Sequence, residues 1–69
     1  MAVDNTIERA AFRKARSLAE QGYADSQYTV GLMYANGMGI PQDFQQALYW
    51  YHQAAENGVA AAQYILAGK

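Results

Sequence analysis

The sequence predicts an all-α fold, a right-handed repeat of about four helices. Three observations predict it: an internal repeat with a period of 36 residues, apolar residues at helical spacing within each unit, and no segment that alternates with period two as a strand would. The 69 residues make one small domain, whose folding buries roughly 60% of the surface of the unfolded chain.

The internal repeat appears when the sequence is shifted by 36 residues and laid on itself. Identical residues then coincide at several pairs of positions, among them Ala11 and Ala47, Ala19 and Ala55, Gly22 and Gly58, Ala24 and Ala60, Gln27 and Gln63, Tyr28 and Tyr64. The segments SLAEQGYADSQYTV and QAAENGVAAAQYIL are therefore two copies of one pattern. A period of this length is typical of helical repeat proteins.

The second long helix is expected over about 43–57. Its apolar residues follow one helix face: Phe44, Ala47, Leu48, Tyr51, Ala54 and Ala55. Asp43 is a good N-cap, and Gln46 three positions later completes a capping-box pattern. Asn57 and Gly58 end the helix, because glycine adopts a left-handed conformation at little cost.

The remaining helices follow from the repeat. The earlier copy of the long helix is expected over about 5–21, capped by Asp4 or Asn5 and ended by Gly22. A short helix over 24–36 lies between the two long helices, and a shortened copy of it begins near residue 59. The expected order is long, short, long, short.

The stretch GMGIPQ raises the question of a phosphate-binding loop. A dinucleotide loop needs three glycines between a strand and a helix, but Gln42 stands where the third glycine belongs and a helix precedes the motif. A corner needs less: Gly37 ends one helix, Gly39 allows an unusual backbone angle, Ile40 enters the core and Pro41 prevents helix continuation. We therefore interpret the stretch as a corner between two helices.

The segment from residue 24 to residue 58 resembles a Sel1-like repeat, a relative of the tetratricopeptide repeat. The resemblance rests on Ala24, Val30-Gly31, Tyr34, Gly37, Gly39, Ile40, Asp43, Ala47, Trp50-Tyr51, Ala54-Ala55 and Gly58. Val30 departs from the pattern, in which leucine is more usual. The resemblance implies an α/α solenoid that serves as a protein-interaction scaffold, commonly in bacteria. Many extracytoplasmic members pair cysteines within each repeat, and this chain has none.

The resemblance also implies a division of the chain. We expect a half-repeat long helix over 1–22, a complete repeat over 23–58, and the first helix of a truncated repeat over 59–69. Both ends would then expose faces that normally lie between repeats. We expect self-association, by end-to-end stacking or exchange of helices, or else a fragment of a longer array. Oligomer formation as the whole role is the competing hypothesis.

In solenoids related to the tetratricopeptide repeat, the first helix of each unit lines the concave surface. The matching positions form the expected partner-binding surface: Asp25, Tyr28, Leu32, Ala35, Asn36 and Tyr64. Tyrosine suits such a surface because it combines apolar area with a polar tip. Packing between repeats is the alternative role, which stays open for Tyr28 and is favoured for Leu32.

Catalysis is not expected, and no cofactor or metal site is predicted. His52, the single histidine, lies on the polar face of its helix, and neither Ser17 nor Ser26 stands in a nucleophile turn. One histidine without other ligands at clear spacing does not predict a metal site.

Nucleic-acid and membrane partners are not expected either. Arg9, Arg13 and Arg16 share one helix stripe near Lys14, but with a net charge of −1 they are interpreted as a solvated face. The N-terminal sequence lacks a signal-peptide pattern, and the apolar-leaning run 59–67 is far shorter than the roughly 18 residues needed to span a bilayer. We therefore expect a cytoplasmic protein that binds a protein or peptide.

Overall fold

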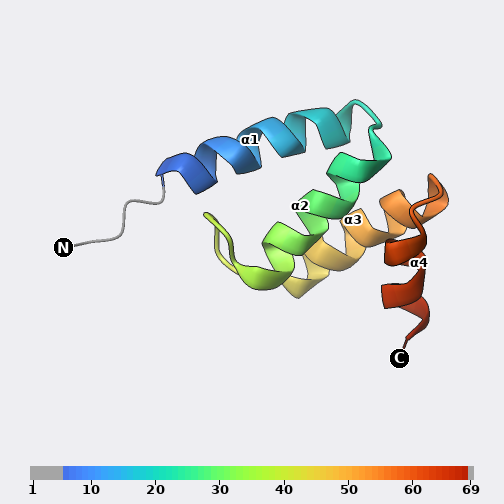
Figure 1. Cartoon of the computed structure of the whole chain (residues 1–69). Helices are drawn as coiled ribbons and strands as arrows, with labels where there is room; N and C mark the ends of the chain where they lie inside the picture. The colour runs from blue at the N-terminus through green and yellow to red at the C-terminus, as the bar shows by residue number, and fades with distance from the viewer. Residues whose placement is uncertain (1–5, 69) are drawn as a thin grey trace.

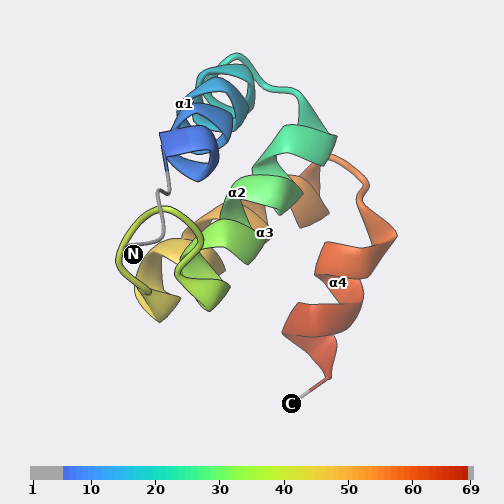
Figure 2. The ribbon, with the colours of Figure 1, turned by 60° about the vertical axis from the view of Figure 1, so that its left-hand side comes forward.

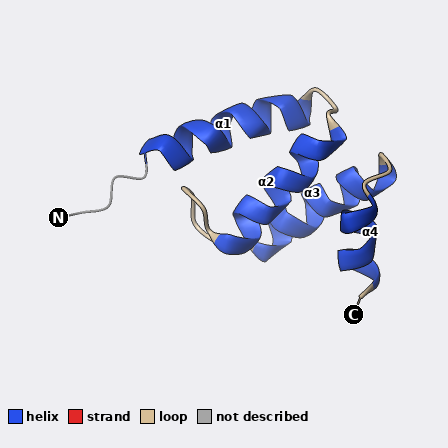
Figure 3. Ribbon diagram, in the orientation of Figure 1, coloured by secondary structure: helices blue, strands red, loops and turns tan. Residues whose placement is uncertain are grey.

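The computed structural model describes residues 6–68, which form an all-α fold. Four helices follow one another in the order α1 (Thr6–Glu20), α2 (Ala24–Asn36), α3 (Phe44–Glu56) and α4 (Ala60–Ala67) (Figures 1 and 3). The described residues contain no strand. The expected four helices and their order are confirmed, but the expected alternation of long and short is wrong for α2 and α3, which both have 13 residues. Asp4 and Asn5, the expected caps of α1, lie outside the described residues.

The helices pack as successive hairpins, the arrangement of an α/α solenoid. Helix α2 packs on α1 on one side and on α3 on the other, and α4 packs on α3 (Figures 1 and 2). Each helix thus contacts mainly its neighbours in sequence, as expected for a repeat protein.

The 36-residue period also appears in the hydrogen bonds. The Gln27 side-chain nitrogen donates to the carbonyl of Ala19 at 3.1 Å, and Gln63 donates in the same way to Ala55 at 3.0 Å. Both bonds tie a helix to the helix before it, α2 to α1 and α4 to α3. In addition, Gln27 accepts a bond of 2.9 Å from the Asn57 side-chain amide, which ties α2 to the end of α3.

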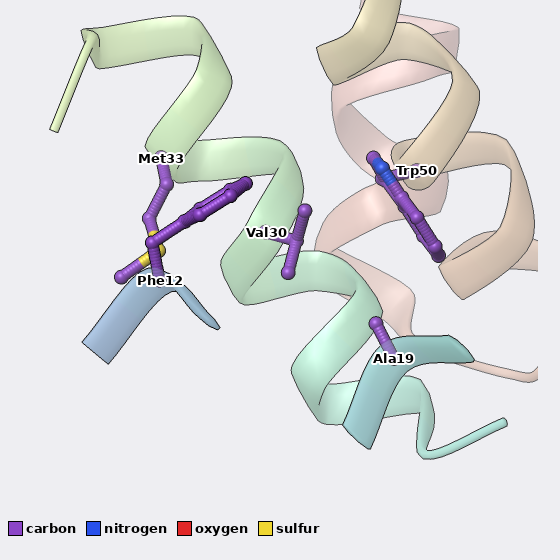
Figure 4. Close-up of a cluster of buried hydrophobic side chains, with 5 residues drawn as sticks. All are labelled: Phe12, Ala19, Val30, Met33 and Trp50. Atoms are coloured by element: carbon purple, nitrogen blue, oxygen red, sulfur yellow. The ribbon is translucent and has the colours of Figure 1, made fainter. Parts of the chain in front are cut away.

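Two clusters of buried side chains form the core. The first joins α1, α2 and α3 and consists of Phe12, Ala19, Val30, Met33 and Trp50 (Figure 4). The second joins α3 and α4 and consists of Ala47, Tyr51, Ala54 and Ala62. Tyr34 packs against both clusters, and its ring meets that of Phe12 edge to face, with centroids 5.3 Å apart.

Gly31 sets the distance between α2 and α3. A Cβ atom at this position would lie 2.7 Å from Cδ1 and Cε1 of the Tyr51 ring, closer than real Cβ atoms come. The glycine therefore allows the ring to lie directly on the backbone of α2. Burial raises the pKa of the Tyr51 hydroxyl above its ordinary value of 10.0, and nearby Tyr28 adds to the shift.

The stretch from Gly37 to Pro41 forms a corner between α2 and α3. Gly37 has a left-handed backbone with φ of 67°, and its N–H donates to the carbonyl of Met33. Ile40 packs against the first core cluster. Gly39 has φ of 76° and lies against the backbone of α1, where a Cβ atom would come within 2.9 Å of the carbonyl carbon of Glu8. Gly39 is thus required by its backbone angle and by a close approach to α1.

Asp43 caps α3, but the capping-box interpretation is only half right. A carboxylate oxygen of Asp43 accepts from the backbone N–H groups of Gln45 at 3.1 Å and Gln46 at 3.2 Å. In a full capping box the Gln46 side chain would bind the Asp43 N–H. That N–H donates instead to the carbonyl of Tyr34 at 2.9 Å, so the cap ties α3 to α2.

The two constraints on Gly39 can be separated by mutation. Gly22 also has positive φ, 103°, but a Cβ atom there would meet nothing within 4 Å. We expect Gly22→Ala to lower the free energy of unfolding by about 1 kcal/mol, from backbone strain alone. Gly39→Ala should cost about 1–3 kcal/mol more, because its methyl group also displaces α1. Urea titration followed by circular dichroism measures both values, and equal losses would contradict the α1 contact.

The raised pKa of Tyr51 predicts a loss of stability in alkaline solution. The unfolded chain releases this proton more readily than the folded chain, so the contribution of Tyr51 is complete below pH 10 and lost as the pH rises through the folded pKa. Thermal unfolding of Tyr51→Phe between pH 8 and pH 11 should therefore show a smaller alkaline decrease in Tm than the wild type. Tyr64→Phe, at an exposed ring, is the matched control, and a wild-type decrease in Tyr51→Phe would refute the assignment.

Candidate protein-binding surface

An apolar groove lies where α2, α3 and α4 meet. Its volume is about 300 Å³. We call it the apolar groove, and it is lined by Ala35, Phe44, Ala47, Leu48, Tyr51, Ile65 and Leu66. None of these side chains carries a charge at neutral pH. The groove therefore offers a surface for apolar side chains rather than for an ion.

Two large side chains of the groove are strongly exposed. Phe44 is 63% exposed and Leu48 is 49% exposed, although both share the apolar face of α3. The Asp43 cap begins α3 at Phe44, so the spacing of four residues places the two side chains one above the other. Ile65 and Leu66 on α4 are half-buried beside them.

The 36-residue period explains why this groove is open. Leu48 corresponds to Phe12 of α1, which is only 8% exposed because α2 covers it with Met33 and Tyr34. In the preceding unit the second half of α2 thus covers the counterpart of Leu48, although Glu8 and Ala11, the counterparts of Phe44 and Ala47, are exposed there. No described segment covers the groove in the second unit.

Three of the expected binding residues take part in packing between helices. Tyr28 is half-buried, with its ring 5.9 Å from that of Tyr51. Leu32 is half-buried against the second core cluster, and Ala35 lines the apolar groove. Tyr28 and Leu32 therefore have structural neighbours that account for their apolar character.

The other three expected binding residues are exposed. Asp25 and Asn36 lie at the two ends of α2, and the Asn36 side chain donates to the carbonyl of Leu32 at 3.0 Å. Tyr64 on α4 is 77% exposed. Although Tyr28 and Tyr64 occupy equivalent positions in the repeat, their surroundings differ: α3 lies over Tyr28, and no described helix lies over Tyr64.

The sequence interpretation missed Phe44 and Leu48 as candidate surface residues. Both follow the apolar period of α3, and that period assigned them to the core. A signal existed at Phe44, which coincides with Glu8 in the shifted sequence, so the first unit has a charged residue where the second has an aromatic one.

The arginine stripe lines a different cavity, of about 510 Å³, between α1 and the corner. Arg9, Arg13 and Arg16 face it above Phe12 and Ile40. Arg16 forms a salt bridge of 3.0 Å with Glu20, in which both side chains are about half exposed, and such surface pairs contribute little to stability.

The histidine and the serine considered above for catalysis lie on different helices. His52 is exposed on α3, and the Ser17 hydroxyl on α1 accepts a hydrogen bond of 3.4 Å from the Gln21 amide. Within residues 6–68, no group of three His, Cys, Asp or Glu side chains is placed to hold a metal ion. No helix of this part of the chain is long and apolar enough to cross a membrane.

Comparisons with known proteins agree with the architecture. The family model of the Sel1 repeat matches residues 24–59. The chain is also similar to the chitin synthase regulator SKT5 of the fungus Malassezia restricta, with 42% identity over 48 residues, which are 70% of this chain and 3% of that protein. No solved structure matches. The Sel1 match covers half of the sequence and coincides with α2, α3 and the corner between them, and the chain belongs to the Sel1 repeat family.

Proposed function

We propose that this chain is a non-catalytic protein-interaction module that binds its partner at the apolar groove and the adjoining exposed face of α4. The observation that carries the proposal is the exposure of Phe44 and Leu48 beside a cavity of about 300 Å³. Isolated exposed apolar residues are ordinary, whereas a contiguous apolar hollow is typical of an interaction site. Membership of the Sel1 repeat family, whose repeats generally mediate contacts between proteins, supports the proposal.

The chemistry of the groove indicates the kind of partner. Its lining is uncharged, with Phe44 and Leu48 at the rim and Ile65 and Leu66 opposite, so it suits an apolar face of a helix or an apolar peptide segment. Within the surface expected from sequence, Ala35 and Tyr64 belong to this region. Asn36 is a polar position next to the groove residue Ala35, whereas Asp25 lies at the other end of α2, in a separate hollow with Leu18 and Tyr23. Tyr28 and Leu32 contribute chiefly by supporting α2.

The area of the groove limits its affinity. Buried aromatic or aliphatic anchors contribute about 2 kcal/mol or more each when fully desolvated. Interfaces far smaller than about 1,200 Å² are usually weak, so we infer that strong binding requires several repeats acting together. In this proposal the units are a half-repeat over 1–22, a complete repeat over 23–58 and the first helix of a truncated repeat over 59–69.

The name of the relative, a chitin synthase regulator, supports a non-catalytic role. The chain spans about 3% of that relative, so its partner is not transferred to this protein. The relative is fungal, and the match does not support the bacterial origin that the resemblance implied.

Self-association is the second candidate function. One observation favours it: Tyr28 is covered by α3, whereas its equivalent Tyr64 is 77% exposed. A helix that covered Tyr64 as α3 covers Tyr28 would complete the repeat.

The proposed groove can be tested by replacing exposed residues of α3. We expect Phe44→Ala with Leu48→Ala to reduce binding of a protein captured by the wild-type chain at least tenfold, because both anchors are removed. Tyr49→Ala is the matched control: Tyr49 is 53% exposed on the same helix, outside the groove. Binding is measured by calorimetric titration and helicity by circular dichroism. A folded double variant that binds like the wild type would refute the groove.

A further inference from the structure

Helix α4 reproduces α2 in sequence and in attachment, but only α2 is covered. Both helices begin after an extended residue without a side-chain cap, Tyr23 or Val59, and both are tied by a glutamine to the preceding helix. On α2 the adjoining face lies under α3, at Gly31 and Tyr28. The corresponding positions on α4 are Ala67 and Tyr64, and both are exposed.

Helix α1 has the complementary open face. The buried side chains of α3, which pack against its neighbouring helices, are Ala47, Trp50, Tyr51 and Ala54, each less than a tenth exposed. They correspond, 36 residues earlier, to Ala11, Lys14, Ala15 and Leu18 of α1. Ala11 and Lys14 are exposed, whereas Ala15 and Leu18 are half-buried and Ala15 packs against the first core cluster, so this face of α1 is open over its first half. Ile7, one turn before Ala11, is 82% exposed.

We propose that α1 of a second copy of this chain docks on α4 in the register in which α3 docks on α2. We infer a second copy as the partner because the fold already contains the equivalent interface, between α2 and α3. The exposed face of α4 corresponds to the α2 side of that interface, and the exposed face of α1 corresponds to the α3 side, each with a shift of 36 residues. This inference rests on the proposed interaction function and names the partner of the α4 face.

The side chains that would meet in this register are compatible. Gly31 must lack a Cβ atom because the Tyr51 ring lies against it. In the docked pair, Ala67 occupies the position that Gly31 has in the contact between α2 and α3, and Ala15 of the second copy occupies the position of Tyr51. The methyl group of Ala67 is therefore accommodated, because Ala15 has no ring to clash with it. Tyr28 already fits beside the Tyr51 ring, so Tyr64 fits beside the smaller Ala15, and the docked contact is less filled than the contact between α2 and α3.

A polar contact is also reproduced. Gln27 accepts a hydrogen bond from the side-chain amide of Asn57 at 2.9 Å. The counterparts are Gln63 on α4 and Gln21 just after α1, and glutamine carries the same amide donor as asparagine. Gln21 of the second copy would therefore donate to the side-chain oxygen of Gln63.

The charges do not oppose this docking, but one substitution weakens it. Helix α4 has no charged side chain. On the docking face of α1, Lys14 stands where α3 has Trp50, and Arg9, Arg13 and Arg16 line a different cavity. Lys14 can lay its aliphatic stem along α4, but it buries less apolar area than tryptophan. The association should therefore be weak, and Lys14→Trp should strengthen it.

The proposed contact is heterologous, which permits a sharp test. A head-to-tail interface extends into open chains or rings, whereas an isologous interface stops at a dimer. Tyr64→Asp blocks only the α4 face and Ala11→Glu blocks only the α1 face, and both replaced side chains are exposed. Each variant alone should be monomeric by sedimentation velocity at concentrations where the wild type associates. An equimolar mixture should form a heterodimer that grows no further.

The matched control and a variant with increased affinity complete the experiment. Tyr49→Asp changes an exposed tyrosine outside both faces and should associate like the wild type, while Lys14→Trp should lower the apparent Kd at least tenfold. Circular dichroism verifies the fold of every variant. Monomeric behaviour of both the wild type and Lys14→Trp up to millimolar concentration would overturn the proposal, as would a mixture of the two blocked variants that stays monomeric.

The result separates this inference from the proposed function. If the chain stays monomeric, and Phe44→Ala with Leu48→Ala abolishes partner binding, the proposed function is supported and docking between copies is refuted. A chain that self-associates as described, but binds no other protein through the groove, supports the inference and refutes the broader proposal.

Discussion

The close packing of α2 on α3 at Gly31 is the contact on which the rest of the structure depends. Because Gly31 has no side chain, the Tyr51 ring lies on the α2 backbone and is buried there. The same ring is part of the second core cluster, supports Tyr28 and forms one wall of the apolar groove. A bulkier residue at position 31 would separate the helices, and would disturb the core, the groove and the seat of α4 together.

The repeat explains both the core and the open surfaces with one physical constraint. A single helical unit cannot bury its own apolar faces, so each unit depends on its neighbours. Within the described residues, α2 and α3 each pack against a helix on both sides. Helices α1 and α4 each pack mainly against one helix, which explains why Ile7 and Tyr64 are exposed. The candidate interaction surfaces are therefore packing surfaces without a partner.

Much of the fold followed from local chemistry. The corner was predictable because Gly37 and Gly39 allow backbone angles outside the helical range and Pro41 prevents continuation of the helix. The start and the end of α3 were predictable from Asp43 and Gly58. The candidate site was less predictable. Leu48 has the same apolar period as buried residues of α3, so its exposure depends on which segment lies above it. Hydrophobic periodicity identifies a face but does not identify what covers that face.

The sequence by itself determined the helices, their order and the 36-residue equivalence of the two units, because helix propensity, capping and spacing act over a few residues. Tertiary structure alone decided how the shared positions differ. Tyr28 lies under α3, whereas Tyr64 is exposed. The Asp43 N–H donates to the carbonyl of Tyr34 rather than to the Gln46 side chain, and Gly39 lies against the backbone of α1. These outcomes depend on distances between residues remote in sequence, which a local pattern does not contain. Burial and the satisfaction of buried polar groups are properties of the packed helices together.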